Sequence, residues 1–111
     1  MDIEEQRQGA VTVVRPVGPL VQGEVEQFRA RVHDVTTRSL GRLVLDASAI
    51  PYVDSPGLEA LVAVSDDLNE GGRALRVAGA GETLREVVDL TGLSDRFEFY
   101  EDTHTAVRSF L

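Results

Sequence analysis

The chain has 111 residues, 42% of them apolar, with 11 basic and 19 acidic residues, no cysteine and a formal net charge of −8. This length is typical of one domain, taken as residues 1–111, and the acidic balance argues against a nucleic-acid interface, which needs a basic surface. Every basic residue is arginine, which excludes P-loop nucleotide chemistry, and the absence of cysteine excludes disulfides, thiol nucleophiles and thiolate metal sites.

The first third of the chain predicts two strands and a helix. Residues 3–8 and 11–17 flank Gly9, as in a β-hairpin, and the second segment is rich in β-branched valine. Residues 24–40 repeat apolar side chains at helical spacing, and Gly41 is a typical residue at which such a helix ends.

The remainder alternates strands with helices. Residues 42–46 form a short, continuous apolar run, which indicates a central strand covered on both faces. The later patterns predict, in order, a helix over 56–70, a strand over 74–78, a helix after Gly81, a strand over 97–100 and a final helix beginning at Asp102 or Thr103. We therefore expect an α/β fold: an N-terminal β-hairpin, then alternating β-α units that form a mainly parallel sheet flanked by helices.

No segment predicts membrane insertion or export. The N-terminal residues are acidic and lack the apolar core of a signal peptide. The longest apolar run, residues 60–64, is far shorter than the roughly 20 residues that span a bilayer. We therefore expect a cytoplasmic protein.

The most informative segment connects the third predicted strand to the second helix. Residues 45–58 read Leu-Asp-Ala-Ser-Ala-Ile-Pro-Tyr-Val-Asp-Ser-Pro-Gly-Leu. Ser55 directly precedes Pro56, which predicts Ser55 as the N-cap and Pro56 as the first helical residue. The Ser55 hydroxyl would then accept a hydrogen bond from the amide of Gly57 or Leu58. On spacing alone, Ser55 could be a structural cap and nothing more.

Two neighbours of Ser55 favour an exposed functional surface. Asp54 places negative charge at the positive end of the helix dipole. Gly57 has no side chain, so another protein could approach the backbone of the first helical turn.

This segment resembles the STAS domain of bacterial anti-sigma factor antagonists, in which it runs approximately Asp-x-Ser-x-apolar-x-aromatic-apolar-Asp-Ser-Ser-Gly-Leu. The matching residues here are Asp46, Ser48, Ile50, Tyr52, Val53, Asp54, Ser55, Gly57 and Leu58. The stretch Leu90-Thr91-Gly92-Leu93 also fits, as do the length and the order of elements, so the resemblance covers essentially the whole chain.

The resemblance implies a regulatory binding module rather than an enzyme, with no cofactor of its own. In that family the serine at this position is phosphorylated by a partner that is both anti-sigma factor and kinase and that brings ATP and Mg²⁺. The unmodified protein binds the partner and frees the sigma factor, and phosphorylation breaks the complex. Ser55 is therefore the expected phosphoacceptor, and Asp54, Pro56, Gly57 and Leu58 are expected to form part of the partner-binding surface.

Two residues depart from the family pattern. Pro56 stands where the family usually has a second small hydroxyl residue, and Val21 replaces an acidic residue after the second strand. These departures leave open a STAS-like module that docks constitutively, without phosphorylation, within a signalling or lipid-transport assembly.

A small serine hydrolase is the alternative from a different functional class. A nucleophile elbow needs glycine two residues before the serine, and that position is Val53. The only histidines, His33 and His104, lie in polar stretches and offer no metal-ligand spacing. A receiver domain, the rival of similar size, needs a lysine that this chain lacks.

Overall fold

A five-stranded sheet with the order β1-β2-β3-β4-β5 forms the centre of the protein in the computed structural model, which describes all of residues 1–111. The first pair, β1 and β2, is antiparallel, and the other three pairs are parallel. The strands are β1 (Asp2–Gln8), β2 (Val11–Val17), β3 (Leu43–Asp46), β4 (Leu75–Ala78) and β5 (Phe97–Tyr100). The helices are α1 (Val25–Ser39), α2 (Ser55–Glu70), α3 (Glu82–Leu90) and α4 (Thr103–Arg108), with a 3₁₀ turn at Ser94–Arg96. The predicted α/β class, element order and mainly parallel sheet are confirmed.

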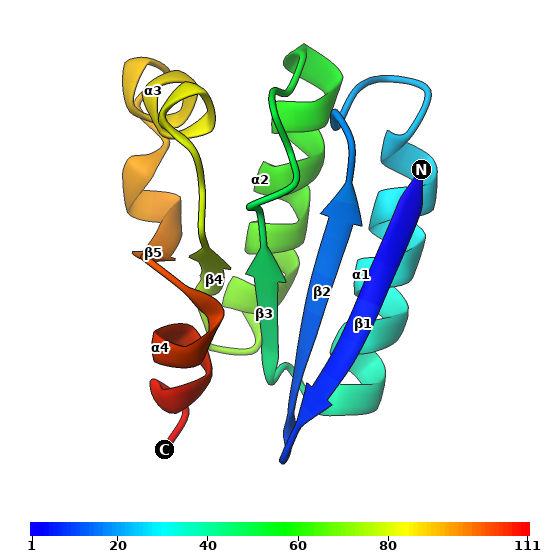
Figure 1. The fold of residues 1–111 in the computed structure, drawn as a ribbon, viewed down its shortest axis with the longest axis vertical. Helices are drawn as coiled ribbons and strands as arrows, with labels where there is room; N and C mark the ends of the chain where they lie inside the picture. The colour runs from blue at the N-terminus through cyan, green and yellow to red at the C-terminus, as the bar shows by residue number, and fades with distance from the viewer.

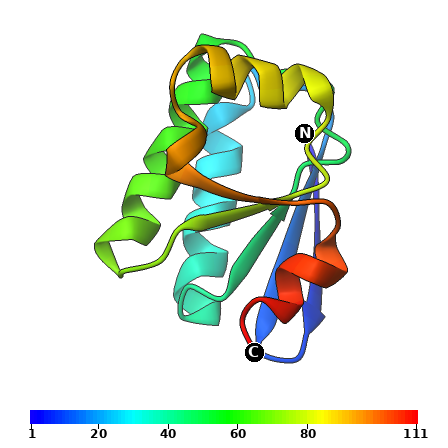
Figure 2. The same cartoon turned by 90° about the vertical axis from the view of Figure 1, so that its left-hand side faces the viewer.

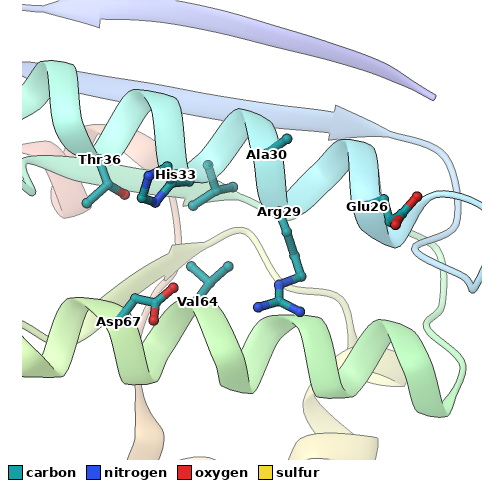
Figure 3. Close-up of a pocket in the computed structure, with 8 residues that line it drawn as sticks. Glu26, Arg29, Ala30, His33, Thr36, Val64 and Asp67 are labelled. Atoms are coloured by element: carbon teal, nitrogen blue, oxygen red, sulfur yellow. The ribbon is translucent and has the colours of Figure 1, made fainter.

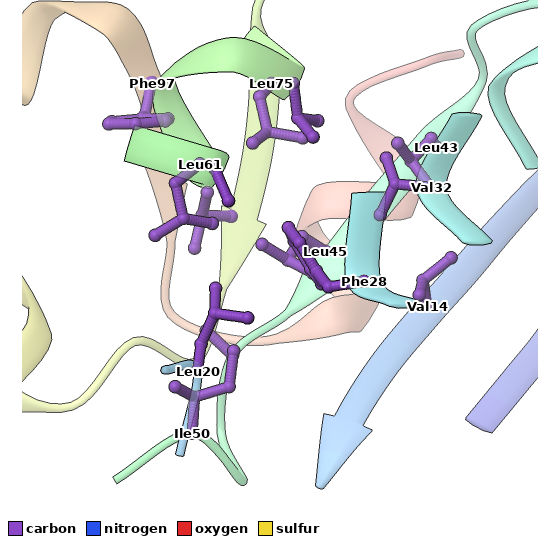
Figure 4. Close-up of a cluster of buried hydrophobic side chains, with 14 of the residues drawn as sticks. Val14, Leu20, Phe28, Val32, Leu43, Leu45, Ile50, Leu61, Leu75 and Phe97 are labelled. Atoms are coloured by element: carbon purple, nitrogen blue, oxygen red, sulfur yellow. The ribbon is translucent and has the colours of Figure 1, made fainter. Parts of the chain in front are cut away.

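Helices cover the two faces of the sheet unequally. The long helices α1 and α2 lie against one face, and the short α4 lies against the other (Figures 1 and 2). The larger core has 18 buried residues and includes Phe28, Leu45 and Leu61, which come from α1, β3 and α2 (Figure 4). A second cluster of five buried residues lies under α4.

The central strand β3 explains the continuous apolar run in the sequence. Leu43 and Leu45 belong to the larger core, whereas Val44, between them, belongs to the cluster under α4. Successive side chains of a strand point to opposite faces, so a strand covered on both faces has no polar alternation. The prediction of a doubly covered central strand is confirmed.

The predicted end of α1 at Gly41 is confirmed, and the residue before it adds a feature that was not predicted. Leu40 already adopts the left-handed conformation, with φ 54°, and Gly41 follows it with φ 80°. The turn therefore uses two consecutive left-handed residues, of which only the second is glycine.

No helix of the structure has the length and apolar character needed to cross a membrane.

Candidate functional site

Two loops meet at the edge of the sheet where the parallel strands end, at the top of Figure 1. The loop after β2 donates to the loop after β3 through two backbone hydrogen bonds, Gly18 N–H to Ala49 O at 2.9 Å and Leu20 N–H to Tyr52 O at 3.1 Å. Leu20 also forms an isolated parallel bridge with Val53. These bonds continue the β2–β3 pairing beyond the strands, so the segment leading to Ser55 is held on a hydrogen-bonded platform.

Asp54, rather than Ser55, is the N-cap of α2. Its Oδ1 accepts from the Gly57 amide at 2.8 Å, and its backbone carbonyl accepts from the Leu58 amide at 2.9 Å. The prediction that Ser55 caps the helix is therefore wrong. A carboxylate is as good a cap as a hydroxyl and adds a charge at the positive end of the helix dipole, so the residue before Ser55 takes the role.

The second carboxylate oxygen of Asp54 ties the two loops together. Asp54 Oδ2 accepts a hydrogen bond from the backbone amide of Gln22 at 3.0 Å, and the backbone amide of Asp54 donates to Leu20 O at 3.3 Å. Asp54 thus joins the loop after β2, the loop after β3 and the first turn of α2. This role uses the backbone carbonyl of Leu20 and the backbone amide of Gln22, so no side-chain pattern in the sequence could have indicated it.

Gly57 is buried and is required by close backbone packing. A Cβ at this position would lie 2.0 Å from the Leu20 carbonyl oxygen and 3.2 Å from Asp54 Oδ1. The glycine therefore lets the loop after β2 cross directly over the first turn of α2. The sequence suggested that Gly57 leaves the surface open to another protein. In the structure the glycine is required by a contact within the chain.

Ser55 itself is exposed, and its hydroxyl has no hydrogen-bond partner within the chain. The backbone around it leaves few free donors. Pro56 has no N–H, and the amides of Gly57 and Leu58 already donate to Asp54. A group attached to Ser55 Oγ would therefore project into solvent instead of replacing bonds within the helix start.

The other predicted binding residues lie around this serine at different depths. Pro56 and Leu58 are half-buried, and Leu58 packs against the larger core. Val21 is half-buried in the same turn as Gln22, next to the amide that Asp54 binds. Tyr52, two residues before Asp54, is 50% exposed, which is unusual for a large aromatic side chain and was not predicted as a surface residue.

The largest hollow on the surface lies elsewhere, in an open groove of about 530 Å³ between α1 and α2. Its lining includes His33 and Asp67, on facing helices (Figure 3). The other histidine, His104, belongs to α4 on the opposite face of the sheet. Neither histidine makes a hydrogen bond to Ser55, and the structure has no cluster of three or more metal-ligating side chains.

A family model for the STAS domain matches residues 2–106 of the chain. Among solved structures, the fold is similar to an anti-sigma factor antagonist from Mycobacterium paratuberculosis, with a TM-score of 0.83 and 24% identity over 97% of this chain and 92% of that one. It is also similar to the Bacillus cell fate determinant SpoIIAA in its phosphorylated form, with a TM-score of 0.71 and 18% identity over 97% of this chain and 99% of that one.

A membrane protein contains a similar unit. The match to the murine Slc26a9 anion transporter has a TM-score of 0.77 and 22% identity, and it covers 95% of this chain but 18% of the transporter. At these identities the likeness establishes a shared fold, which therefore occurs both in small regulators and as one part of a transporter.

Proposed function

The chain belongs to the STAS domain family, and we propose that it acts as an anti-sigma factor antagonist whose binding is switched by phosphorylation of Ser55. The unmodified protein binds an anti-sigma factor that is also a serine kinase and so frees the sigma factor. The kinase supplies ATP and Mg²⁺, and the chain itself performs no catalysis. The observation that carries the proposal is the free, exposed hydroxyl of Ser55 on a platform held by Asp54.

The electrostatics of the helix start support a switch that acts on binding more than on folding. Phosphorylation would add about 1.5 to 2 negative charges at Ser55. Within the free protein the dipole of α2 favours an anion at this end, and solvent can hydrate the phosphate. In a docked complex the same phosphate would lose its water beside the carboxylate of Asp54, which destabilises the complex.

The docking surface is proposed to surround Ser55. Pro56 and Leu58 offer partly exposed apolar area on the first turn of α2, and the ring of Tyr52 offers more on the preceding loop. Asp54 and Gly57 contribute by holding this turn against the loop after β2. A rigid surface loses little conformational entropy on binding, which favours affinity.

Constitutive docking is the second candidate, and two residues favour it. Pro56 removes a backbone amide beside the phosphoacceptor and stiffens the segment that a kinase must accommodate. Val21 puts an apolar side chain in the turn that contacts Asp54, where the family pattern has an acid. The similar unit in an anion transporter shows that this fold also serves inside a larger assembly. A lipid-transport assembly would use the same surface without a phosphate.

The two candidates are separated by measuring phosphorylation and binding on the same protein. The purified chain is incubated with a candidate anti-sigma kinase and ATP, and its intact mass is followed. The switch predicts a gain of one phosphate that Ser55→Ala abolishes and Ser48→Ala does not, because Ser48 is the matched exposed serine of the same loop. No gain, together with identical binding by Ser55→Ala and the parent, would refute the switch.

Binding of Ser55→Asp gives the second comparison. The switch predicts that this variant binds the partner at least about tenfold more weakly, which corresponds to roughly 1.4 kcal/mol. Constitutive docking predicts no change. Covalent labelling of Ser55 by a fluorophosphonate would instead support a serine hydrolase.

A further inference from the structure

Helix α3 lies across the edge of the sheet that carries Ser55, crosswise to the long helices α1 and α2 (Figures 1 and 2). Two of its nine residues, Leu84 and Val88, are buried, and both belong to the larger core. The two are four positions apart and so lie one above the other on the helix. Helix α3 is therefore packed on the molecule through one narrow apolar stripe.

Helix α3 also lacks the polar bonds that tie the other helices to distant parts of the chain. Arg31 of α1 donates to the Ile3 carbonyl of β1 at 3.2 Å, and Ser65 of α2 donates to a carbonyl of the 3₁₀ turn at 2.7 Å. Ser109, at the end of α4, accepts from Arg76 of β4 at 2.7 Å. By contrast, α3 has no hydrogen bond or ion pair with any residue more than five positions away.

One charged side chain of α3 reaches a strand. The guanidinium carbon of Arg85 lies 4.8 Å from the centroid of the Phe99 ring in β5. The ring attracts a cation at this distance, but only weakly when the cation stays hydrated. Arg85 is exposed and Phe99 is half-buried, so this contact can hold α3 in place and can also break at low cost.

The surface beneath α3 is apolar and incompletely filled. A small hollow of about 10 Å³ separates α3 from a floor formed by Leu45, Leu61, Val77, Phe97 and Phe99. Three of these side chains, from β3, α2 and β5, are labelled in Figure 4. No polar residue lines the hollow, so a water molecule would find no hydrogen-bond partner there. Atoms that face a void lose dispersion contacts, so α3 gains less from packing than a helix on a filled core does.

Glycines stand at both ends of α3. Gly79, with φ 69°, and Gly81, the N-cap, precede the helix, and Gly92, with φ 73°, follows it. A Cβ at Gly81 or Gly92 would meet no atom within 4 Å, so close packing does not hold these two positions. Glycine adopts the widest range of backbone conformations, so both ends can absorb the rotation of a moving helix.

We propose that α3 is a hinged lid, held closed by Arg85, that opens while the sheet, α1 and α2 stay folded. Opening gives up the packing of Leu84 and Val88 and the contact with Phe99, and a unit with so few buried contacts opens more readily than the whole protein unfolds. The open lid uncovers the apolar floor at the edge of the sheet that carries Ser55. The protein thus has two different surfaces at this edge, whether or not Ser55 is phosphorylated.

Thiol labelling of the full chain tests the lid. The chain has no cysteine, so one introduced thiol reports opening without background. Val88→Cys places the thiol under α3, and Val35→Cys places it under α1 at a position that is also buried. In native buffer, N-ethylmaleimide should label the first variant at least about 100-fold faster than the second, and urea should change its rate less, because opening exposes little surface. Equal rates with equal urea dependence, in variants of equal free energy of unfolding, would overturn the proposal.

Hydrogen exchange of the unsubstituted protein gives an independent measurement. The amides of residues 86–90 should exchange faster than those of β3 and should respond less to urea, because they exchange through the open lid. Equal protection and equal urea dependence in α3 and β3 would overturn the proposal.

A matched pair of variants tests the contact that holds the lid closed. In the Val88→Cys protein, Arg85→Gln should speed labelling about two- to fivefold, because it removes the cation from the Phe99 ring. Glu86→Gln changes the neighbouring exposed residue, which has no ion pair, and should leave the labelling rate unchanged. N-ethylmaleimide is neutral, so the opposite charge changes of the two variants do not themselves attract or repel it. Equal labelling rates in the two variants would overturn the role of Arg85.

Discussion

Asp54 Oδ1 accepts a hydrogen bond from the Gly57 amide at 2.8 Å, so the residue in front of Ser55, and not Ser55 itself, caps helix α2. The helix therefore has its cap without using the serine hydroxyl. Because Asp54 provides the cap, Ser55 stays exposed and its hydroxyl stays free, on a turn whose position Asp54 fixes. A phosphoacceptor needs both properties, because a kinase must reach the hydroxyl and a partner must recognise the surface around it.

The first prediction concerns the cap. Asp54→Ala should lower the free energy of unfolding by about 2 kcal/mol, because it removes the acceptor for Gly57 and leaves the Gln22 amide without its partner. Asp54→Asn keeps a side-chain carbonyl oxygen for the Gly57 amide, so it should lower the free energy of unfolding clearly less than Asp54→Ala does. Urea unfolding of the parent and both variants measures the difference, and equal losses in the two variants would contradict the bridging role.

The second prediction concerns the serine. Ser55→Ala should change the free energy of unfolding by less than about 0.5 kcal/mol, because its hydroxyl bonds to nothing in the chain. If Ser55 were the cap, the loss would be about 1 kcal/mol. Thermal or urea unfolding distinguishes these values, and a stable Ser55→Ala protein also makes any loss of phosphorylation interpretable.

The third prediction concerns the glycine under Leu20. Gly57→Ala should destabilise the protein by about 1–3 kcal/mol, although alanine is the better helix former, because its Cβ would lie 2.0 Å from the Leu20 carbonyl oxygen. Gly23→Ala is the matched control, since a Cβ there meets no atom within 4 Å. An unfolding midpoint for Gly57→Ala equal to that of Gly23→Ala would contradict the close packing of the two loops.

The fourth prediction concerns acid stability. The hydrogen bond from the Thr105 amide, at 2.8 Å, lowers the pKa of Asp102 below its ordinary value of 3.8. A carboxyl group whose pKa is depressed on folding stabilises the protein above its unfolded pKa, and this contribution disappears as the pH falls through its folded pKa. Below about pH 4 the parent should therefore lose stability more steeply than Asp102→Asn, whose side chain still caps α4 but does not titrate.

Urea midpoints of both proteins from about pH 7 to about pH 3 test this difference. The urea midpoints of the parent and of Asp102→Asn should converge toward the lowest pH values. Parallel curves would show that Asp102 does not contribute to the pH dependence of stability.

The sequence predicted the fold well because its periodic signals were unambiguous. The apolar run around Val44 indicated a doubly covered strand, and the turn at Gly9 indicated the hairpin, and both are confirmed. The 3₁₀ turn at Ser94–Arg96 and the left-handed Leu40 were not predicted. A turn of three residues, Ser94–Arg96, is too short to show a helical repeat of apolar side chains. A leucine in the sequence does not indicate a positive φ.

The candidate site was predicted less completely. The segment from Asp54 to Leu58 was correctly placed at the start of α2, but its hydrogen bonds were assigned to the wrong side chain. Asp and Ser are equally good caps, so local propensity could not choose between adjacent residues. The choice depends on Gln22 and Leu20, which reach Asp54 through their backbones across 32 and 34 positions of sequence.

A phosphorylation switch requires that Ser55 is modified in the living cell. The most direct measurement is the intact mass of the protein isolated from its own host during growth and under stress, with the modified residue located by peptide fragmentation. The switch predicts two species that differ by one phosphate on Ser55 and whose ratio changes between the two conditions. A single unmodified species in both conditions, or a phosphate on another residue, would contradict it.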